Sequence, residues 1–245
     1  MPFAVILPAA GKSSRFGGRE KKPYTALDGR PVWLRTAELF VNRPDVAQLL
    51  LVIAPDDREL VERRYAANLM FLDIQLVDGG AERFESVANA LAHLKPAADF
   101  VAVHDAVRPC VPPAVIDAVF AAATAHGAAL PGVAVTDTLK RVDAGGRVVE
   151  TVARDGLWQV QTPQAFRRDW LEAAYARRNK VGVTITDDAQ LVEAAGHPVQ
   201  VVPGSPFNLK ITTADDLKLA AQFLKLREAE DKPKPRAAFD DERFL

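Results

Sequence analysis

Cysteine is nearly absent from this sequence, which has Cys110 alone among its 245 residues. A single cysteine cannot form a disulfide within the chain or a cysteine-rich metal site, and it fits a reducing compartment. Long hydrophobic runs are missing too, since no apolar stretch approaches the ~20 residues that a membrane-spanning helix needs. The apolar residues 1–8 are too short for the core of a signal peptide and have no cationic leader. These absences predict a cytoplasmic protein without a membrane partner.

An excess of charge of one sign is also missing. Lys and Arg number 31 against 32 Asp and Glu, which gives a formal net charge of −1. Proteins that bind nucleic acids or membrane surfaces depend on a large cationic excess, so this balance argues against both partners. With 49% hydrophobic and 26% charged residues, the composition is that of a globular fold with a substantial core. Any anionic ligand must therefore be bound by a few locally placed cations.

Strand and helix patterns alternate along most of the chain. Continuous apolar runs, such as residues 49–53, are typical of strands buried on both faces of a parallel sheet. Strands are predicted at residues 3–8, 48–54, 74–77, 100–104, 128–135 and 199–202, and helices at 32–40, 57–67, 85–94, 113–126, 169–178, 187–195 and 214–227. Because such alternation implies βαβ units, the sequence predicts an α/β fold, a three-layer sandwich around a mostly parallel, twisted sheet.

One segment departs from this alternation. Residues 138–142 and 147–152 have strand patterns and flank a turn that contains Gly145 and Gly146, which predicts a β-hairpin in a protruding arm at about residues 136–158. An isolated two-stranded ribbon is marginally stable in water and needs a surface to pack against. That surface can belong to its own domain or to a second subunit, and the spacing favours neither.

The composition changes near the end of the chain. Residues 231–245 are charged, contain proline and have few apolar side chains, so they cannot bury enough surface to order themselves. We expect a single domain over residues 1–230, followed by a charged tail or the stub of a linker.

The strongest chemical signal is the loop 8–18, PAAGKSSRFGG, directly after the first predicted strand. Glycine lets a backbone approach a ligand closely, and successive N–H groups form a concavity that binds anions. Open α/β sheets bind their ligands at the carboxyl ends of parallel strands, where this loop lies. It lacks the Gly-Lys-Ser/Thr of a P-loop, and its glycine spacing does not match a dinucleotide fingerprint. From these residues alone, a plain turn with Arg15 in solvent is an equal alternative.

Further motifs follow in order along the chain. They are HDAVRP at 104–109, TDTLK at 136–140, RDGLW at 154–158, QTPQ at 161–164, TDDA at 186–189 and NLKIT at 208–212. Together with the opening loop, this set resembles the 2-C-methyl-D-erythritol 4-phosphate cytidylyltransferase family of the non-mevalonate isoprenoid pathway, over roughly residues 3–226. The resemblance implies a fold of the nucleotide-diphospho-sugar transferase type. It also implies transfer of CMP from CTP to a polyol phosphate, with release of pyrophosphate and with Mg²⁺ as cofactor.

That reaction needs positive charge more than it needs a base. The acceptor phosphate is already an anion, and the obstacle is like-charge repulsion and the negative charge that grows around the α-phosphorus. By resemblance, the catalytic cations are Arg15, Lys22 and Lys210. Family members commonly have a proline before the first of these lysines, whereas Lys21 and Lys22 both precede Pro23 here, so Lys21 is an alternative to Lys22.

The resemblance assigns the remaining site residues to two substrates. CTP is expected to contact small residues and main-chain groups, namely Ala9, Ala10, Gly11, Gly80, Ala81, Ser86 and Ala106. Ala81 stands where the family often has an acid, which leaves one base contact to the main chain. The acceptor is expected at Asp105, Thr138, Arg154, Thr162 and Lys210.

Two of these assignments carry further expectations. Asp105 is assigned either to the sugar phosphate or to the Mg²⁺ shell, because Mg²⁺ commonly binds one or two carboxylates plus substrate phosphates. Its neighbour His104 has no proton transfer to perform and is predicted to be structural.

Thr138 and Arg154 flank the predicted hairpin, and in the family they enter the neighbouring subunit's site. The resemblance therefore implies a homodimer formed through the arm, in which an arginine fork binds the acceptor phosphate.

Two rival functions use some of the same residues. A cytidylyltransferase for ribitol 5-phosphate needs the same fold and almost the same cations, so only its acceptor pocket would differ. A nucleotide-binding regulatory module needs affinity but no cations for a transition state. The joint presence of Arg15, Asp105 and Lys210 speaks against such a module.

Overall fold

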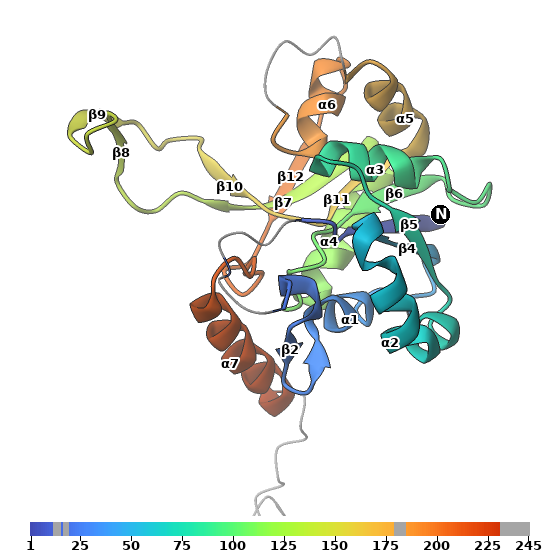
Figure 1. Ribbon diagram of the computed structural model, residues 1–245. Coiled ribbons are helices and arrows are strands. Elements are labelled where there is room, and N and C mark those ends of the chain that lie inside the picture. Colours follow the sequence, from blue (N-terminus) through green and yellow to red (C-terminus); the bar gives the residue numbers. More distant parts are fainter. Residues whose placement is uncertain (12–15, 17–19, 179–184, 231–245) are drawn as a thin grey trace, which may run out of the picture.

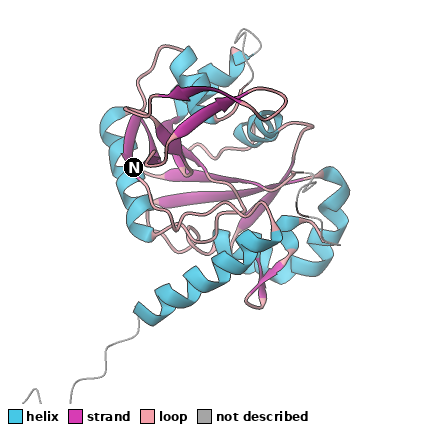
Figure 2. Ribbon diagram, turned by 90° about the vertical axis from the view of Figure 1, so that its left-hand side faces the viewer, coloured by secondary structure: helices cyan, strands magenta, loops and turns pink. Residues whose placement is uncertain are grey.

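An eight-stranded sheet forms the centre of the computed structural model, which describes residues 1–11, 16, 20–178 and 185–230. The order along the sheet is β10-β7-β11-β6-β1-β4-β5, and β12 also pairs with β7 (Figures 1 and 2). The strands are β1 (Phe3–Pro8), β4 (Val46–Ile53), β5 (Ile74–Asp78), β6 (Phe100–Val103), β7 (Ala128–Ala134), β10 (Trp158–Val160), β11 (Gln164–Arg167) and β12 (Gln200–Pro203). Arg15 and the tail 231–245 lie outside the described residues.

Most of this sheet is parallel, as predicted. The central strand β1 runs parallel to β4 and β6, with Val5 opposite Leu49 on one side and Ala102 on the other. The pairs β4–β5 and β12–β7 are also parallel. The exceptions are β11, which lies antiparallel between β6 and β7, and β10, which is antiparallel to β7. Neither exception was predicted, because each is only three or four residues long and its pairing depends on distant strands.

Helices cover both faces of the sheet, which confirms the predicted three layers (Figure 1). They are α1 (Val32–Ala37), α2 (Arg58–Phe71), α3 (Arg83–Leu91), α4 (Pro113–His126), α5 (Arg168–Ala176), α6 (Asp188–Ala194) and α7 (Ala214–Glu230). Two single turns, η1 (Lys22–Tyr24) and η2 (Pro55–Asp57), and a small ribbon of β2 (Ala26–Leu27) with β3 (Arg30–Pro31) connect the larger elements. Across the described ranges, none of the helices is long and apolar enough to cross a membrane.

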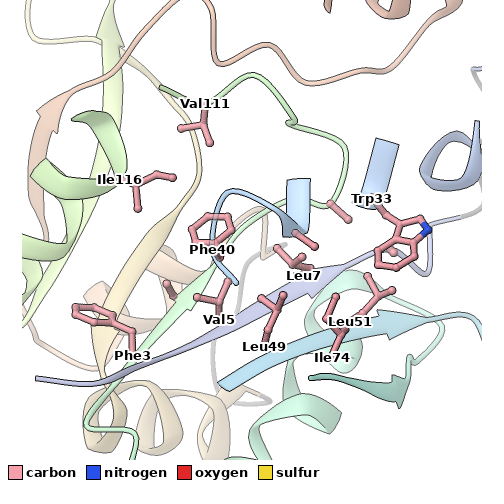
Figure 3. Close-up of a cluster of buried hydrophobic side chains, with 14 of the residues drawn as sticks. Phe3, Val5, Leu7, Trp33, Phe40, Leu49, Leu51, Ile74, Val111 and Ile116 are labelled. Carbon is pink, nitrogen blue, oxygen red and sulfur yellow. The ribbon is translucent and has the colours of Figure 1, made fainter. Parts of the chain in front are cut away.

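The alternation of side chains along β1 divides the core in two. Phe3, Val5 and Leu7 belong to a cluster that includes side chains from α1, α2 and α4 (Figure 3). Ala4 and Ile6 point to the opposite face, where side chains from α3, α5 and α6 cover the sheet. Successive strand residues face opposite sides, so a strand that is buried on both faces must be apolar throughout.

The hairpin is present and forms the predicted arm. Its strands are β8 (Leu139–Val142) and β9 (Val148–Val152), and they pair only with each other in the described sheet topology. Figure 1 shows the arm reaching away from the body of the molecule. Exposed apolar side chains mark the arm and its base, namely Val142, Val148, Val149, Leu157, Trp158 and Val160. Within the described part of this single chain, the arm therefore finds no surface to cover these groups.

Candidate active site

A cleft of about 540 Å³ lies at the carboxyl ends of β1, β4, β5 and β6. Nine residues predicted from the sequence line it: Ala9, Ala10, Gly11, Lys22, Gly80, Ala81, Ser86, Asp105 and Lys210. The remaining lining residues are Pro8, Lys21, Pro23, Ala54, Asp56, Glu82, Arg83 and Val107. Segments from the two ends of the described chain thus meet in one hollow, where an open α/β sheet is expected to bind its ligand.

A glycine pair after β5 brings the backbone close to the cleft wall. The Gly79 N–H donates to the Ile53 carbonyl at 2.7 Å, and a Cβ atom at this position would lie 2.6 Å from the Cβ of Ala10. A Cβ atom on Gly80 would overlap the Glu85 side chain. Only glycine fits this close approach, which places the amino end of α3 at the cleft.

The Ser86 hydroxyl holds the same turn together. It accepts from the Gly80 N–H at 3.1 Å and donates to the Glu82 carbonyl at 3.2 Å. The Glu85 carboxylate accepts from the Glu82 N–H at 3.1 Å, at the third position of the helix. The first turn of α3 is thereby fixed, and its amino end favours anions.

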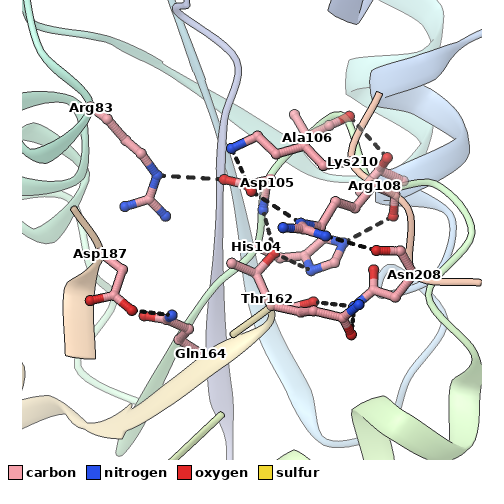
Figure 4. A network of polar contacts seen from close by, with 12 residues as sticks. Arg83, His104, Asp105, Ala106, Arg108, Thr162, Gln164, Asp187, Asn208 and Lys210 are labelled. Carbon is pink, nitrogen blue, oxygen red and sulfur yellow. Dashed lines mark hydrogen bonds and ion pairs between the residues drawn. The ribbon is translucent and has the colours of Figure 1, made fainter. Parts of the chain in front are cut away.

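Asp105 is the buried carboxylate of the cleft, and three cations surround it (Figure 4). Its Oδ2 lies 3.0 Å from Lys210 Nζ and 3.2 Å from Arg108 Nε. Its Oδ1 lies 3.5 Å from Arg83 Nε. Burial raises the pKa of a carboxyl, but Arg83, Lys210 and Arg108 outweigh that effect and hold the pKa of Asp105 well below its usual range. Asp105 is therefore ionised at neutral pH.

Lys210 reaches the cleft from a loop between β12 and α7. The loop is anchored on both sides of the lysine, because Arg108 Nη1 donates to the Asn208 carbonyl at 2.7 Å and the Ile211 N–H donates to the Val107 carbonyl at 2.9 Å. The Lys210 side chain is 41% exposed, more than that of Arg83 or Arg108. It is the cation around Asp105 that has most access to a bound ligand.

His104 and Thr162 form a layer behind Asp105 (Figure 4). The Thr162 Oγ1 accepts from the Asp105 N–H at 3.1 Å and lies 3.2 Å from Nδ1 of His104. Nε2 of His104 lies 3.1 Å from the Arg108 carbonyl. Burial lowers the pKa of His104 to about 4, so its ring is neutral at pH 7. Thr162 does not line the cleft, and it contacts the Asp105 backbone instead.

Ala106 also lies just behind the cleft. It is fully buried, and its carbonyl accepts from the Thr36 hydroxyl at 2.9 Å. Its N–H donates to the Pro8 carbonyl at 3.4 Å. Ala106 therefore joins the loops after β6 and β1 through its backbone.

Both candidate lysines of the η1 segment line the cleft. Lys21 Nζ lies 2.7 Å from Oδ1 of Asp57, a buried carboxylate whose Oδ2 accepts from the Tyr24 hydroxyl at 3.2 Å. Burial is the largest of the causes that raise the pKa of Tyr24, followed by the charge of Asp57. The tyrosine is thus a neutral donor that fixes Asp57, which in turn fixes Lys21.

The sequence analysis missed Arg83 as a site residue. Its Nη1 lies 2.9 Å from Oδ2 of Asp188, which is only 1% exposed. Burial lowers the pKa of an arginine, but the charges of Asp188 and Asp105 outweigh it and raise the pKa of Arg83. Arg83 stands beside the small residues that were assigned to CTP, yet its partners are distant in sequence, and this distance hid its role.

The two arm residues do not join the cleft of their own chain. Thr138 and Arg154 are exposed, and Arg154 Nη1 contacts the Thr136 carbonyl at the base of the arm. Neither residue lines the cleft. The expectation that they bind the acceptor is therefore not met within a single chain.

No group of three or more potential metal-ligating side chains occurs among the residues that the structure describes. An ionised carboxylate such as Asp105 is nevertheless a hard oxygen ligand of the kind that Mg²⁺ prefers, and Mg²⁺ takes its other ligands from phosphates and water. The cleft thus presents Lys21, Lys22 and Lys210 and the amino end of α3, groups that favour anions, and Asp105 is its buried carboxylate.

Fold and site together define an α/β nucleotidyltransferase. Similar solved structures include 2-C-methyl-D-erythritol 4-phosphate cytidylyltransferase from Thermus thermophilus, which has a TM-score of 0.76 and 33% identity over 92% of this chain and 100% of that one. The family model "IspD: 2-C-methyl-D-erythritol 4-phosphate cytidylyltransferase" matches residues 3–226. The chain belongs to this family.

Curated relatives agree with this membership. A 2-C-methyl-D-erythritol 4-phosphate cytidylyltransferase from Frankia casuarinae is 46% identical over 222 residues, which cover 90% of this chain and 80% of the relative. One of the same name from Acidobacterium capsulatum is 40% identical over 238 residues, covering 94% of this chain and 100% of the relative. The resemblance inferred from the motifs is confirmed.

Proposed function

We propose that this chain transfers a cytidylyl group from CTP to 2-C-methyl-D-erythritol 4-phosphate, giving 4-diphosphocytidyl-2-C-methyl-D-erythritol and pyrophosphate. The observation that carries the proposal is the cleft itself. It joins the glycine turn before α3, the lysines of η1 and the Asp105–Lys210 ion pair at the carboxyl ends of four strands. Family membership supplies the identity of the two substrates.

The reaction follows from the charges. An oxygen of the acceptor phosphate attacks the α-phosphorus of CTP, and the bond from that phosphorus to the bridging oxygen of pyrophosphate breaks. No proton has to move, so the site needs no general base. Lys22 and Lys210 stabilise the negative charge that grows at the α-phosphoryl oxygens, because preorganised cations in a partly desolvated site need little reorganisation. Arg15, which lies outside the described residues, is assigned the same role.

CTP is held mainly by backbone and small side chains in this scheme. Ala9, Ala10 and Gly11 approach the nucleotide from the loop after β1, and Gly80, Ala81 and Ser86 approach it from the amino end of α3, with Ala106 behind them. Walls built of such small residues let the backbone approach the nucleotide closely. Asp105 is assigned to the acceptor side, where it orients the substrate or its cation, and Thr162 supports Asp105 by accepting a hydrogen bond from its N–H.

Magnesium is part of the proposal. Asp105 would hold it together with the phosphates of CTP, and the ion supplies positive charge that neutralises those phosphates. Both Asp105 oxygens are paired with cations in the free protein. Lys210, the most exposed of them, is the group that we expect to leave Asp105 for the phosphates when nucleotide binds.

A turnover assay with two acceptors tests the substrate assignment. The protein is incubated with CTP, Mg²⁺ and either methylerythritol phosphate or ribitol 5-phosphate, and pyrophosphate release is measured. We expect methylerythritol phosphate to be turned over far faster. Faster turnover of ribitol 5-phosphate would make the acceptor assignment wrong, and nucleotide binding without turnover of either acceptor would favour a regulatory module.

We also propose that the working form is a homodimer in which each arm completes the partner's site. Support comes from the exposed valines of β8 and β9 and from the placement of Thr138 and Arg154 outside their own cleft. An arginine at the partner's acceptor site gives two parallel hydrogen bonds to a phosphate.

The lone buried Cys110 supports a cytoplasmic setting, where thiols stay reduced.

Subunit mixing tests the arm. Lys210→Ala and Arg154→Ala variants are each expected to be nearly inactive. After subunit exchange, half of the dimers contain one intact site, so about a quarter of all sites regain function if arms are shared. Subunit exchange without any recovery would show that Arg154 serves its own chain.

A further inference from the structure

Arg83 lies at a junction between two buried carboxylates. It is the first residue of α3 and lines the cleft, and its side chain is 30% exposed. Its Nε lies 3.5 Å from Oδ1 of Asp105, and its Nη1 lies 2.9 Å from Oδ2 of Asp188 (Figure 4 shows the Asp105 contact). One guanidinium thereby connects the loop after β6 with the start of α6.

The three cations around Asp105 are not equivalent. Lys210 and Arg108 both contact Oδ2, whereas Arg83 contacts Oδ1. A carboxylate with cations on one oxygen only is free to turn about its Cβ–Cγ bond. With Arg83 on the other oxygen, the plane of the Asp105 carboxylate is fixed, and Oδ2 is presented to Lys210.

Asp188 is not the N-cap of the helix that it begins. The N-cap of α6 is Asp187, whose Oδ1 accepts from the Gln190 N–H at 3.0 Å. Asp188 is instead buried, and its Oδ1 accepts a hydrogen bond from the Tyr175 hydroxyl. Its Oδ2 makes no hydrogen bond among the described residues apart from the ion pair with Arg83.

Burying such a charge is costly unless the ion is paired, and a well-packed apolar pair is often as stable. The Arg83–Asp188 pair is therefore poorly explained as a stability device. Its arginine end lies in the cleft, and its aspartate end is fixed from behind by Tyr175. Such an arrangement holds a cation in a set position beside the Asp105 carboxylate.

We propose that Arg83, held by Asp188, is a positioning residue that sets the orientation of Asp105 and, through it, the resting place of Lys210. The inference rests on the proposed function, since it takes Asp105 and Lys210 as parts of the substrate site. Arg83 affects the rate at which the acceptor phosphate attacks the α-phosphorus and does not affect the affinity for the nucleotide. Its loss therefore lowers kcat more than it changes either KM.

Kinetics of Arg83→Gln and Asp188→Asn test this inference. A charge-assisted hydrogen bond contributes enough to predict a fall in kcat of ~10–100-fold for Arg83→Gln, with both KM values within about threefold of wild type. Asp188→Asn keeps the shape of the side chain and is expected to lower kcat by about three- to tenfold, with both KM values unchanged. Because the two residues act as one unit, the double variant should be no slower than Arg83→Gln alone.

Arg58→Gln is the matched control. Arg58 is the first residue of α2, its side chain is 34% exposed, and it pairs with Asp78 and Glu62 at 2.9 Å each, but it does not line the cleft. Its loss should leave kcat unchanged. Melting temperatures are measured for all variants, and assays are run well below them.

The outcomes separate the inference from the proposed function. If wild type fails to turn over methylerythritol phosphate, the proposed function fails. If wild type is active and Arg83→Gln keeps its kcat, or if the two substitutions have additive effects, the positioning role is refuted. Should Arg83→Gln not fold, the nearly isosteric Asp188→Asn decides: wild-type kcat in that variant refutes the role, and a selective loss of kcat supports it.

Discussion

The buried neutral His104 makes stability depend on pH in a defined window. The residue is 0% exposed, and burial lowers its pKa to about 4, against 6.5 for a free histidine. Between pH 6.5 and pH 4, His104 binds a proton in the unfolded chain but stays neutral in the folded chain. Acidification through this range therefore favours unfolding. Stability contributed by the neutral ring is complete above pH 6.5 and is lost as the pH falls towards 4.

The size of the effect follows from the two pKa values. Integrated between pH 7.5 and pH 4.5, this difference in proton binding costs about 2.5 kcal/mol of the free energy of unfolding. This is a substantial part of the ~5–15 kcal/mol that stabilises a typical domain. Carboxylates with ordinary pKa values of about 4 titrate mostly below pH 4.5. His104 therefore makes the largest contribution to the change in unfolding free energy between pH 7.5 and pH 4.5.

Urea unfolding at pH 7.5 and pH 4.5 measures the loss, with a His104→Asn variant alongside. All other groups titrate in both proteins, including Glu193, whose pKa is raised by burial and by the charge of Asp187. The variant should lose about 2.5 kcal/mol less than wild type between the two pH values. His126→Gln, at an exposed position, should behave as wild type. Equal losses in wild type and His104→Asn would refute the argument that the buried ring is neutral.

Four further predictions concern single substitutions. Lys210→Ala should lower kcat by ~10²–10³, as the loss of a preorganised charge stabiliser does, and unchanged pyrophosphate release would remove it from the mechanism. Asp57→Asn should raise the KM for CTP severalfold because it releases Lys21 from its 2.7 Å ion pair, a result checked by initial-rate kinetics. Gly127→Ala should cost about 2–4 kcal/mol in urea unfolding, since φ is +90° and the new Cβ would overlap an indole ring. Gly146→Ala, at φ +79° with open space around it, should cost only about 1 kcal/mol.

Much of the sheet could be predicted because burial on both faces leaves a continuous apolar run in each central strand. Val5 and Ile6 must both be apolar when helices cover both sides of β1, and the same holds along β4. The antiparallel β11 could not be found in this way. Its four residues pair with β6 and β7, and the position between two distant strands is a property of the tertiary fold.

Helix ends were harder to place than helix positions. The prediction for α4 was correct at both ends, because Pro113 begins the helix and Gly127 ends it in a left-handed conformation. By contrast, α2 continues past the predicted end at residue 67 to Phe71. Because Phe71 is exposed, the last turn of α2 does not continue the helical spacing of buried apolar residues from which the end was predicted.

The candidate site was predictable where its residues stand in motifs, and hidden where they act through a partner. Lys210 and Asp105 belong to motifs that could be read in order, and they meet at 3.0 Å. Arg83 and Asp188 form a pair across more than a third of the chain, and nothing local marks either as the other's partner. Their pairing is decided by which helices cover the same face of the sheet.

The late position of Lys210 in the chain has a consequence for biosynthesis. When a ribosome has finished α6, the backbone for Asp105 and its two arginines already exists, but the lysine that completes the cluster has not been made. Under the proposed mechanism, chains that end before residue 210 lack this lysine and are expected to be inactive, whatever part of the sheet they have formed. In a translation mixture, enzymatic turnover would then measure only chains that have been completed. The fluorescence of Trp33, which is buried beside β1, would report burial of this part of the core at an earlier time.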